Sequence, residues 1–436
     1  MIARILLSAS MAAFLIATFA ASSLARAGDR WPEFRGPTAD GHTNITGLPI
    51  TFSETENVRW KTPIHDRGLS SPVIWDGQIW LTTATADGKK LFAVCVDLDT
   101  GKIVHDITVF EIAEPDYSHP YNSYASATPA IAEGKVFVHY GSAGTACLDT
   151  ATGETLWSRT DLPCNHFRGH GSSPALYKNL LIIHFDGYDY QYVVALDQNT
   201  GETVWRKDRD IDYGTDNGDF KKSYGTPTLI EVDGKMQLIS VATTAMIAYD
   251  PATGDELYRV KHGGFNTAAR PIFGRGKIFI NMEGGKRLLA VEPGGMGDLT
   301  DTNIVWNYEK STPTRPSQTI YDKWLFMVSD IGVATCLDAD TGEAVWTERL
   351  GGPHCASPIE SEGRIYFFDE TGHGTVIEAG PEFKVLAENQ LDEGVFGSPA
   401  VADKSLIVRG LTQLYRLQDE TRVKGQESRA RKEERK

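Results

Sequence analysis

The sequence predicts an all-β protein, an eight-bladed β-propeller of four-stranded antiparallel blades. A proline, usually preceded by a small or hydroxylated residue, opens the same phrase eight times, at Pro72, Pro129, Pro174, Pro227, Pro271, Pro316, Pro358 and Pro399. Successive prolines lie 57, 45, 53, 44, 45, 42 and 41 residues apart, a period that indicates propeller blades. An apolar strand, a tight turn and a second strand follow each proline, so one repeat corresponds to one blade.

The second repeat, residues 126–157, shows how a blade is expected to form. Its proline opens the innermost strand, where a missing N–H is tolerated. Glu133 and Gly134 form a two-residue turn, in which glycine supplies the positive φ that tight hairpins need. Asp149 and Gly153 link the third strand to the fourth, because aspartate bonds its own backbone and glycine adopts the left-handed conformation.

An aromatic residue recurs on the fourth strand, four residues after that glycine in most repeats. The position is held by Trp157, Trp205, Trp346, Tyr258 and His105, and in the fifth repeat, which carries an insert at 294–303, by Trp306. A large side chain at a fixed outer position buries area between neighbouring blades. We therefore predict a structural role for these tryptophans, not a ligand platform.

The eighth repeat stops before its fourth strand. After residues 413–417 the chain becomes a charged tail, 418–436, which we expect to be disordered. Residues 57–64 contain Trp60 but have no repeat of their own. We predict that this strand pairs into the last blade and closes the ring, which removes exposed sheet edges. The predicted propeller therefore spans residues 57–417.

The N-terminal 27 residues form a predicted secretory signal peptide. Arg4 precedes an apolar run, and Ala25-Arg26-Ala27 has the small-x-small form of a cleavage site after Ala27. An uncleaved anchor is the alternative, although the run is short for a spanning helix. With no lipobox cysteine, the protein is expected to be secreted or periplasmic, without membrane insertion after cleavage, and to begin with an extension, residues 28–56.

The charge and the positions of the cysteines argue against a nucleic-acid-binding protein and against a disulfide-bonded one. The formal net charge of −15 argues against a nucleic-acid partner. Cys95, Cys147 and Cys336 fall at the same point of three repeats, too far apart for a disulfide. Cys164 and Cys355 belong to regions half a turn apart in the ring. We therefore expect no disulfide.

The repeat phrase resembles that of pyrroloquinoline-quinone (PQQ) dehydrogenases and their non-catalytic relatives. It stands as SATPAIAEGKVFV and CLDTATGETLW within 126–157, as YVVALDQNTGETVW at 192–205 and as CLDADTGEAVW at 336–346. The resemblance covers residues 58–417. The WPEFRGP segment at 31–37 is similar to that of exported PQQ-like propellers of unassigned activity, and a more distant similarity is to the propeller lipoprotein of outer-membrane protein assembly.

This resemblance implies a fold, not a mechanism. PQQ alcohol dehydrogenases carry an adjacent cysteine pair, and this chain has no Cys-Cys. Their calcium-binding Glu/Asn pair and catalytic aspartate match no positions here, so no catalytic residue is assigned.

Polar loops ahead of the second and third repeats are predicted to converge at the mouth of the central channel. The candidate ligand-binding residues are His119, Asn122, Tyr124, Asn165, His166, Arg168, His170, Arg270, Arg315 and His354. Imidazole, amide and guanidinium groups suit an anionic or polyhydroxylated ligand. The alternative is that they cap backbone where loops cross the face. His166 and His170 have metal spacing only on a helix, which Gly169 argues against.

An acidic insert at 208–219 offers weak candidates for Ca²⁺, namely Asp210, Asp212, Asp216 and Asp219. The EF-hand spacing is missing, so a solvated insert is favoured and no metal site is assigned.

Complete blade signatures without a recognisable catalytic set favour a non-catalytic propeller. We expect it to bind or scaffold a protein, peptide or glycan partner in the cell envelope. The alternative is a quinoprotein oxidoreductase with a reduced site that holds PQQ and Ca²⁺.

Overall fold

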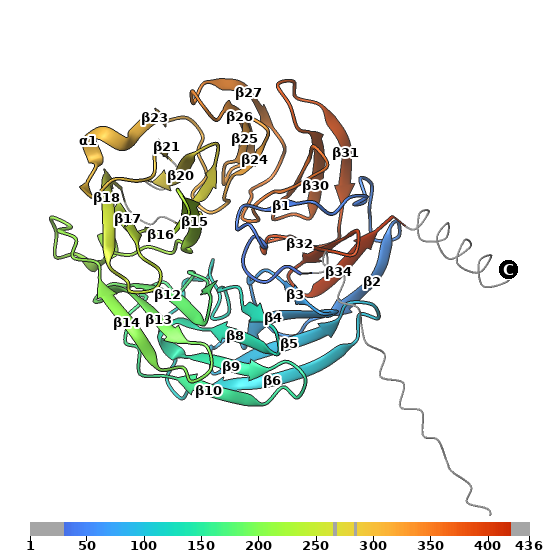
Figure 1. Ribbon diagram of the computed structural model, residues 1–436. Coiled ribbons are helices and arrows are strands. Elements are labelled where there is room, and N and C mark those ends of the chain that lie inside the picture. Colours follow the sequence, from blue (N-terminus) through green and yellow to red (C-terminus); the bar gives the residue numbers. More distant parts are fainter. Residues whose placement is uncertain (1–29, 265–267, 283–285, 420–436) are drawn as a thin grey trace, which may run out of the picture.

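The computed structural model describes residues 30–264, 268–282 and 286–419. Eight sheets surround a central channel, which confirms the predicted eight-bladed propeller (Figure 1). The predicted signal peptide and all but the first two residues of the tail lie outside the described residues. Among the described residues, no helix has the length and apolar character needed to cross a membrane.

Blades 1 to 4 follow one another along the chain, each running from the channel outward. Blade 1 contains β3 (Val73–Trp75), β4 (Gln78–Ala84), β5 (Lys90–Asp97) and β6 (Ile103–Glu111). Blade 2 contains β7 (Ala130–Ala132), β8 (Lys135–His139), β9 (Thr145–Asp149) and β10 (Thr155–Arg159). Blade 3 contains β11 (Ala175–Tyr177), β12 (Leu180–Asp186), β13 (Gln191–Asp197) and β14 (Thr203–Asp208). Blade 4 contains β15 (Thr228–Val232), β16 (Lys235–Val241), β17 (Thr244–Tyr249) and β18 (Glu256–Gly263).

Blades 5 to 8 complete the ring. Blade 5 contains β19 (Ile272–Gly274), β20 (Lys277–Met282), β21 (Arg287–Val291) and β23 (Ile304–Tyr308). Blade 6 contains β24 (Thr319–Tyr321), β25 (Trp324–Val328), β26 (Val333–Asp338) and β27 (Ala344–Arg349). Blade 7 contains β28 (Ile359–Ser361), β29 (Arg364–Phe368), β30 (His373–Glu378) and β31 (Val385–Gln390). Blade 8 contains β32 (Ala400–Ala402), β33 (Ser405–Arg409), β34 (Gln413–Gln418) and, from the start of the chain, β2 (Val58–Pro63).

A few short elements lie outside this pattern. Strand β1 (His42–Thr43) pairs in parallel with β28. The insert of the fifth repeat forms β22 (Gly297–Asp298), which pairs with β18, and helix α1 (Thr300–Asn303). Two 3₁₀ turns, η1 (Gly141–Ala143) and η2 (Gly218–Phe220), lie in loops of blade 2 and ahead of blade 4.

Ring closure occurs as predicted. Strand β2 pairs antiparallel with β34, and the indole N–H of Trp60 donates to the carbonyl of Leu98 in blade 1 at 2.9 Å. The other outer tryptophans repeat this contact: Trp157 donates to Gln198, Trp205 to Pro251, Trp306 to Ala339 and Trp346 to Gly380. Each acceptor belongs to the next blade, so these side chains join blades as expected.

Most of these tryptophan rings lie against the turn between the third and fourth strands of the next blade, and this turn therefore needs glycine. At Gly201, which has φ +73°, a Cβ atom would come within 2.7 Å of the Trp157 ring. This contact explains why the aromatic residue and the turn glycine recur together.

The residue ahead of each innermost strand links neighbouring blades. In most blades its backbone N–H donates to a hydroxyl at the same position of the following blade, as from Ser71 to Thr128 and from Ser398 to Ser71. Blade 5 has Arg270 at this position and therefore offers no hydroxyl to blade 4. Pro316 departs from the pattern, since Gln318 directly precedes β24 and Ser317 supplies the hydroxyl. The sixth repeat is therefore offset by two residues from the proline that marks it.

The N-terminal extension fills the channel, a role that the sequence did not reveal. We call residues 31–41 the plug. Trp31 exchanges two backbone hydrogen bonds of 2.8 Å with Ile74 in blade 1, and the carbonyl of Pro32 accepts from blade 2. Arg35 donates to the carbonyls of Gln318 and Pro358, in blades 6 and 7. The plug therefore contacts inner strands around the ring (Figure 1).

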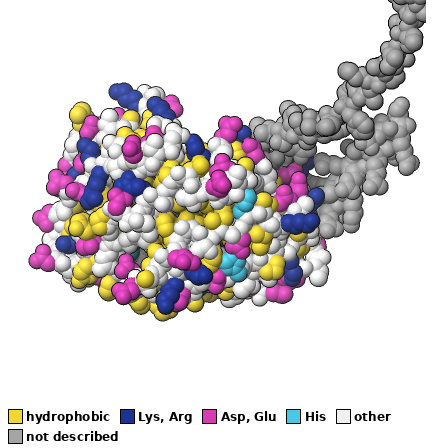
Figure 2. All heavy atoms as spheres, turned by 90° about the horizontal axis from the view of Figure 1, so that it is seen from below, with side chains coloured by type: hydrophobic (Ala, Val, Ile, Leu, Met, Phe, Trp, Pro, Cys, Tyr) yellow, Lys and Arg dark blue, Asp and Glu magenta, His cyan; other side chains and the backbone are white. Residues whose placement is uncertain are grey.

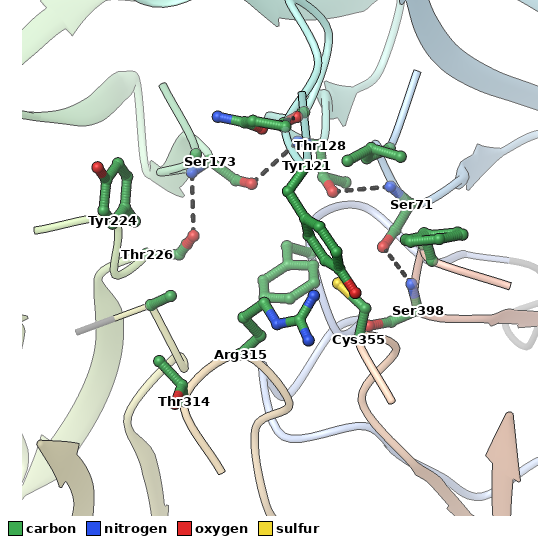
Figure 3. A pocket seen from close by; sticks show the side chains of 18 of the residues that line it. Ser71, Tyr121, Thr128, Ser173, Tyr224, Thr226, Thr314, Arg315, Cys355 and Ser398 are labelled. Atoms are coloured by element: carbon green, nitrogen blue, oxygen red, sulfur yellow. Dashed lines mark hydrogen bonds between the residues drawn. The ribbon is translucent and has the colours of Figure 1, made fainter. Parts of the chain in front are cut away.

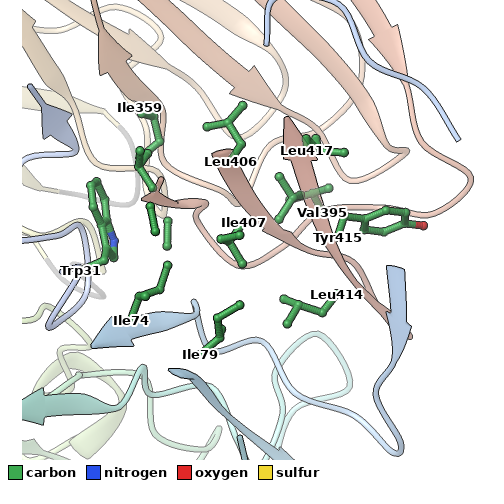
Figure 4. Close-up of a cluster of buried hydrophobic side chains, with 14 of the residues drawn as sticks. Trp31, Ile74, Ile79, Ile359, Val395, Leu406, Ile407, Leu414, Tyr415 and Leu417 are labelled. Carbon is green, nitrogen blue, oxygen red and sulfur yellow. The ribbon is translucent and has the colours of Figure 1, made fainter. Parts of the chain in front are cut away.

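The hydrophobic core is divided into clusters, most of them between adjacent blades. One cluster joins Trp31 of the plug to Ile74 and Ile359 of two inner strands, and it extends into blade 8 (Figure 4). All five cysteines are free thiols. Acidic and basic side chains are intermingled on the side of the ring in Figure 2.

Candidate functional site

A cavity of about 350 Å³ opens at the mouth of the channel, and we call it the channel cavity (Figure 3). Phe34 of the plug contributes to its lining. Hydroxyls that link the blades also line it, among them Ser71, Thr128, Ser173, Thr226 and Ser398. Because the plug occupies the channel axis, the cavity is a pocket and not a passage through the ring.

The structure brings together the two polar loops ahead of blades 2 and 3. The N–H of His119 donates to the carbonyl of Arg168 at 3.2 Å. The side-chain amide of Asn122 donates to the carbonyls of Arg168 and His170, each at 3.0 Å. We call these interlocked loops, residues 113–124 and 165–171, the wall. His119, Asn122 and Arg168 face the channel cavity.

Tyr121 extends from the wall across the mouth toward blades 6 and 7. Its hydroxyl donates to a carboxylate oxygen of Glu370 at 2.5 Å, and the guanidinium of Arg315 lies 4.8 Å from its ring centre. Burial, followed by the bond to Glu370, raises the pKa of the Tyr121 phenol. Arg315 itself is 2.7 Å from Asp330 and 3.1 Å from Glu370. This network places one cation at the far side of the channel cavity.

Arg168 is the second cation at the channel cavity. Its side chain is 44% exposed and lies 3.1 Å from Asp219. The ammonium of Lys222 is 2.5 Å from the same carboxylate and, with Arg168, lowers the pKa of Asp219. Asp219 is thus engaged by two cations of the protein.

The weak calcium candidates do not gather into a site. Asp212 accepts from the backbone of Gly214, and Asp210 lies in the left-handed region with φ +46°. Asp216 lies in the same exposed loop. No set of three or more His, Cys, Asp or Glu side chains in the described part of the chain is placed to hold a metal ion.

Three other predicted residues lie away from the channel cavity. Arg270 is buried under it and donates to Glu33 at 2.7 Å and to the carbonyl of Phe34, so it anchors the plug. His354 is buried and bonded to the carbonyl of Gly352, and burial lowers its pKa. Asn165 lines neither cavity described here, and its N–H donates to Asp189.

Tyr124, His166 and His170 face a second cavity, of about 310 Å³, on the opposite side of the wall. We call it the side cavity. His139 of β8 packs against His170, with ring centres 5.7 Å apart, and His166 lies 6.0 Å from His170. Burial lowers the pKa of His166 to about 4 and that of His170 to about 3. These imidazoles are therefore neutral at pH 7.

Sequence reasoning missed the plug, Tyr121 and His139, and it did not place Cys355 at the channel cavity, which this residue lines. Arg270 carried a usable signal, because an arginine replaces the hydroxyl that other repeats have ahead of the inner strand. A buried arginine at that point needs an acceptor, and Glu33 supplies it. Tyr121 and His139 had no such signal, since their contacts come from other blades.

Comparison with solved structures shows the same fold at low sequence identity. BamB from Moraxella catarrhalis matches with a TM-score of 0.59 and 12% identity, covering 82% of this chain and 99% of that one. Quinohemoprotein alcohol dehydrogenase from Comamonas testosteroni matches with a TM-score of 0.66 and 13% identity, covering 90% of this chain and 81% of that one. No curated protein sequence matches the chain.

A family model identifies the sequence relationship more directly. The model described as outer membrane protein assembly factor BamB matches residues 50–190, 189–322 and 298–381, and the chain therefore belongs to this family of PQQ-like propellers.

Proposed function

We propose that this protein is an exported, non-catalytic propeller that binds a protein, peptide or glycan partner in the cell envelope. The channel cavity receives an acidic group of the partner. The observation that carries this proposal is the pairing of Arg168 and Arg315 around one pocket closed below by the plug. The family's description as an assembly factor also supports binding over catalysis.

The chemistry of the lining favours a ligand with an anionic and an apolar part. Guanidinium groups form strong, directed bonds to carboxylates. The rings of Phe34, Phe396 and Tyr224 supply apolar surface at the same cavity. The oxygens of Ser173 and Thr226 accept backbone N–H groups of the preceding blades, so these hydroxyls contribute a fixed polar rim.

Site-specific photocrosslinking tests the proposal in cells that produce the protein. A benzoylphenylalanine at Tyr121, which is 49% exposed at the mouth, is expected to yield a discrete adduct. The same group at Met296, which is 86% exposed on the blade 5 insert, is the matched control and is expected to yield none. Combining the probe with Arg168→Gln and Arg315→Gln should lower the yield of the adduct about tenfold or more. Each lost charge-assisted hydrogen bond reduces the binding free energy by about 1.5–3 kcal/mol. Equal adducts at both positions would contradict the proposal.

The second candidate is a quinoprotein oxidoreductase, because His119 and both arginines line the same cavity. The cavity has the size of a cofactor site, and its arginines suit the carboxylates of PQQ, which would supply the oxidising power. The carboxylates of Asp330 and Glu370 are already paired with Arg315. The described residues thus fit the anionic part of the cofactor, but no three of their His, Cys, Asp or Glu side chains are placed to hold Ca²⁺.

Quinone titration separates the two candidates. Adding PQQ and Ca²⁺ to the purified protein is expected to produce neither stoichiometric quinone absorbance nor dye-linked alcohol oxidation. Tight stoichiometric binding together with oxidation, lost in His119→Gln, would establish the enzyme and overturn the binding proposal.

A further inference from the structure

The side cavity is lined by acidic and aromatic residues and lies apart from the proposed partner site. Glu114 and Asp116 lie on its rim, and among its described lining residues there is no lysine or arginine. Asp116 receives one long hydrogen bond, 3.4 Å from the hydroxyl of Ser142. The histidines of the cavity add no positive charge because they are neutral at pH 7. The cavity therefore presents negative charge alone.

Tyrosine rings form much of the remaining surface. Tyr124 packs against Gly88, where a Cβ atom would come within 2.6 Å of the ring. Tyr140 is buried, and its hydroxyl is held by the carbonyl of Phe92 at 2.8 Å. Tyr117 is 60% exposed at the rim. Two rings are thus fixed by packing, and a third is available to close over a ligand.

Unsatisfied polar atoms distinguish this cavity from a simple packing gap. His170 is 6% exposed, faces the cavity, and its Nε2 atom has no hydrogen-bond partner. The Nε2 atom of His166, which also lines the cavity, is likewise buried without a partner. Leaving a buried polar group unpaired costs about 1–3 kcal/mol, so such groups in a cavity indicate a missing polar partner.

We propose that the side cavity binds a small organic cation that carries hydroxyl groups, such as an amino sugar. The ammonium group lies near Asp116 and Glu114 and against the tyrosine faces, both of which attract cations. The hydroxyl groups pair with the imidazoles of His166 and His170, since neutral imidazole both donates and accepts. The volume of about 310 Å³ accommodates a ligand of this size.

Matched sugars test the proposal on the full protein. D-glucosamine and D-galactosamine are the cationic probes, and D-glucose and D-galactose are their neutral counterparts. Calorimetry at pH 7 is expected to show at least one amino sugar binding about tenfold more tightly than its neutral counterpart, the fold-change that one carboxylate and one aromatic face contribute. Equal affinities, or no binding of either amine up to about 50 mM, would overturn the proposal.

Two single-charge variants locate the binding. Asp116→Asn is expected to weaken the amino sugar several-fold and to leave the neutral sugar unchanged. Glu111→Gln removes the same charge from β6, where the side chain is exposed and lines neither cavity. It is expected to change nothing. Because both side chains are exposed, both variants should fold, and a thermal melt of each verifies this. Equal effects of the two variants would overturn the assignment.

The side cavity is also separable from the proposed partner site. Arg168→Gln and Arg315→Gln should lower the Tyr121 adduct about tenfold or more while amino-sugar affinity stays within about twofold, because neither arginine lines the side cavity. Loss of amino-sugar binding in these variants would place it in the channel cavity instead.

Discussion

The channel cavity and the side cavity share one wall but are lined by different charged side chains. Arg168 and Arg315 face the first, whereas Glu114 and Asp116 face the second. Residues two apart in one loop, such as His166 and Arg168, belong to different cavities. The comparison shows that one short loop between rigid blades can line two cavities with different charged groups.

Removing Arg270, which anchors the plug beneath the channel cavity, should have the largest effect on stability. Arg270→Met leaves the carboxylate of Glu33, whose side chain is 12% exposed, without its cation. Breaking a buried pair in this way costs about 3–5 kcal/mol, so urea unfolding should show a loss of that order. Near neutrality, amino-sugar binding at the side cavity should persist.

The matched control is Arg275→Met in the same blade. Arg275 pairs with Asp340 at the surface, where both side chains are more than one third exposed. Such pairs contribute about 0–1 kcal/mol. If Arg270→Met costs no more than Arg275→Met, the plug is not held as described.

Acidification should lower the stability of the folded protein through the two buried histidines of the wall, His166 and His170. Burial keeps the pKa of His166 near 4 and that of His170 near 3, below the ordinary value of about 6.5. As the pH falls below about 6.5, the unfolded chain binds protons that the folded chain excludes, so stability is lost toward pH 4. Between pH 7 and pH 5 the loss should approach about 2 kcal/mol for each imidazole.

Chemical denaturation at the two pH values measures this loss. His170→Gln keeps a neutral polar side chain and should reduce the difference between pH 7 and pH 5 by about 2 kcal/mol. His354, buried on the other side of the channel cavity, also has a lowered pKa, so part of the pH dependence should remain in this variant. An unchanged pH dependence in His170→Gln would show that His170 titrates normally.

The smallest effect is expected at the mouth of the channel cavity. Tyr121→Phe removes one hydrogen bond to Glu370 but keeps the ring under Arg315. Because the tyrosine is half exposed, stability should change by about 1 kcal/mol or less. The photocrosslinking yield from a neighbouring probe at His119 should change little. A large loss of stability would mean that Tyr121 holds the blades together and not only the mouth.

Much of the ring followed from local signals. The period of the prolines, the Asp-Gly turns and the outer tryptophans each report on one blade or on one joint between blades. Even the Trp60 strand could be placed, because it has the sequence of a fourth strand without a repeat, and the eighth repeat lacks one. The offset at Pro316 was not visible, since only hydrogen-bonded register distinguishes that proline from Gln318.

The candidate sites were only partly predictable. The loops of His119 and Arg168 stood out because they are polar, and the His119 loop also lies in the longest interval between repeats, of 57 residues. The side of the wall that each residue faces could not be predicted, because a loop backbone has no fixed periodicity. Arg270 was placed at the mouth by analogy with Arg315, although the two-residue offset in blade 6 puts these arginines at different levels.

The sequence by itself determined the blade, the number of blades and the way the ring closes, because these depend on patterns repeated within about 45 residues. Only the tertiary structure decided that residues 31–41 fill the channel and that one wall separates a cavity lined by arginines from a cavity lined by carboxylates. Those features depend on single contacts between segments more than 200 residues apart, such as Arg270 with Glu33 and Tyr121 with Glu370. Each contact occurs only once, so no repeated pattern in the sequence indicates it. The partners come together only when the ring closes.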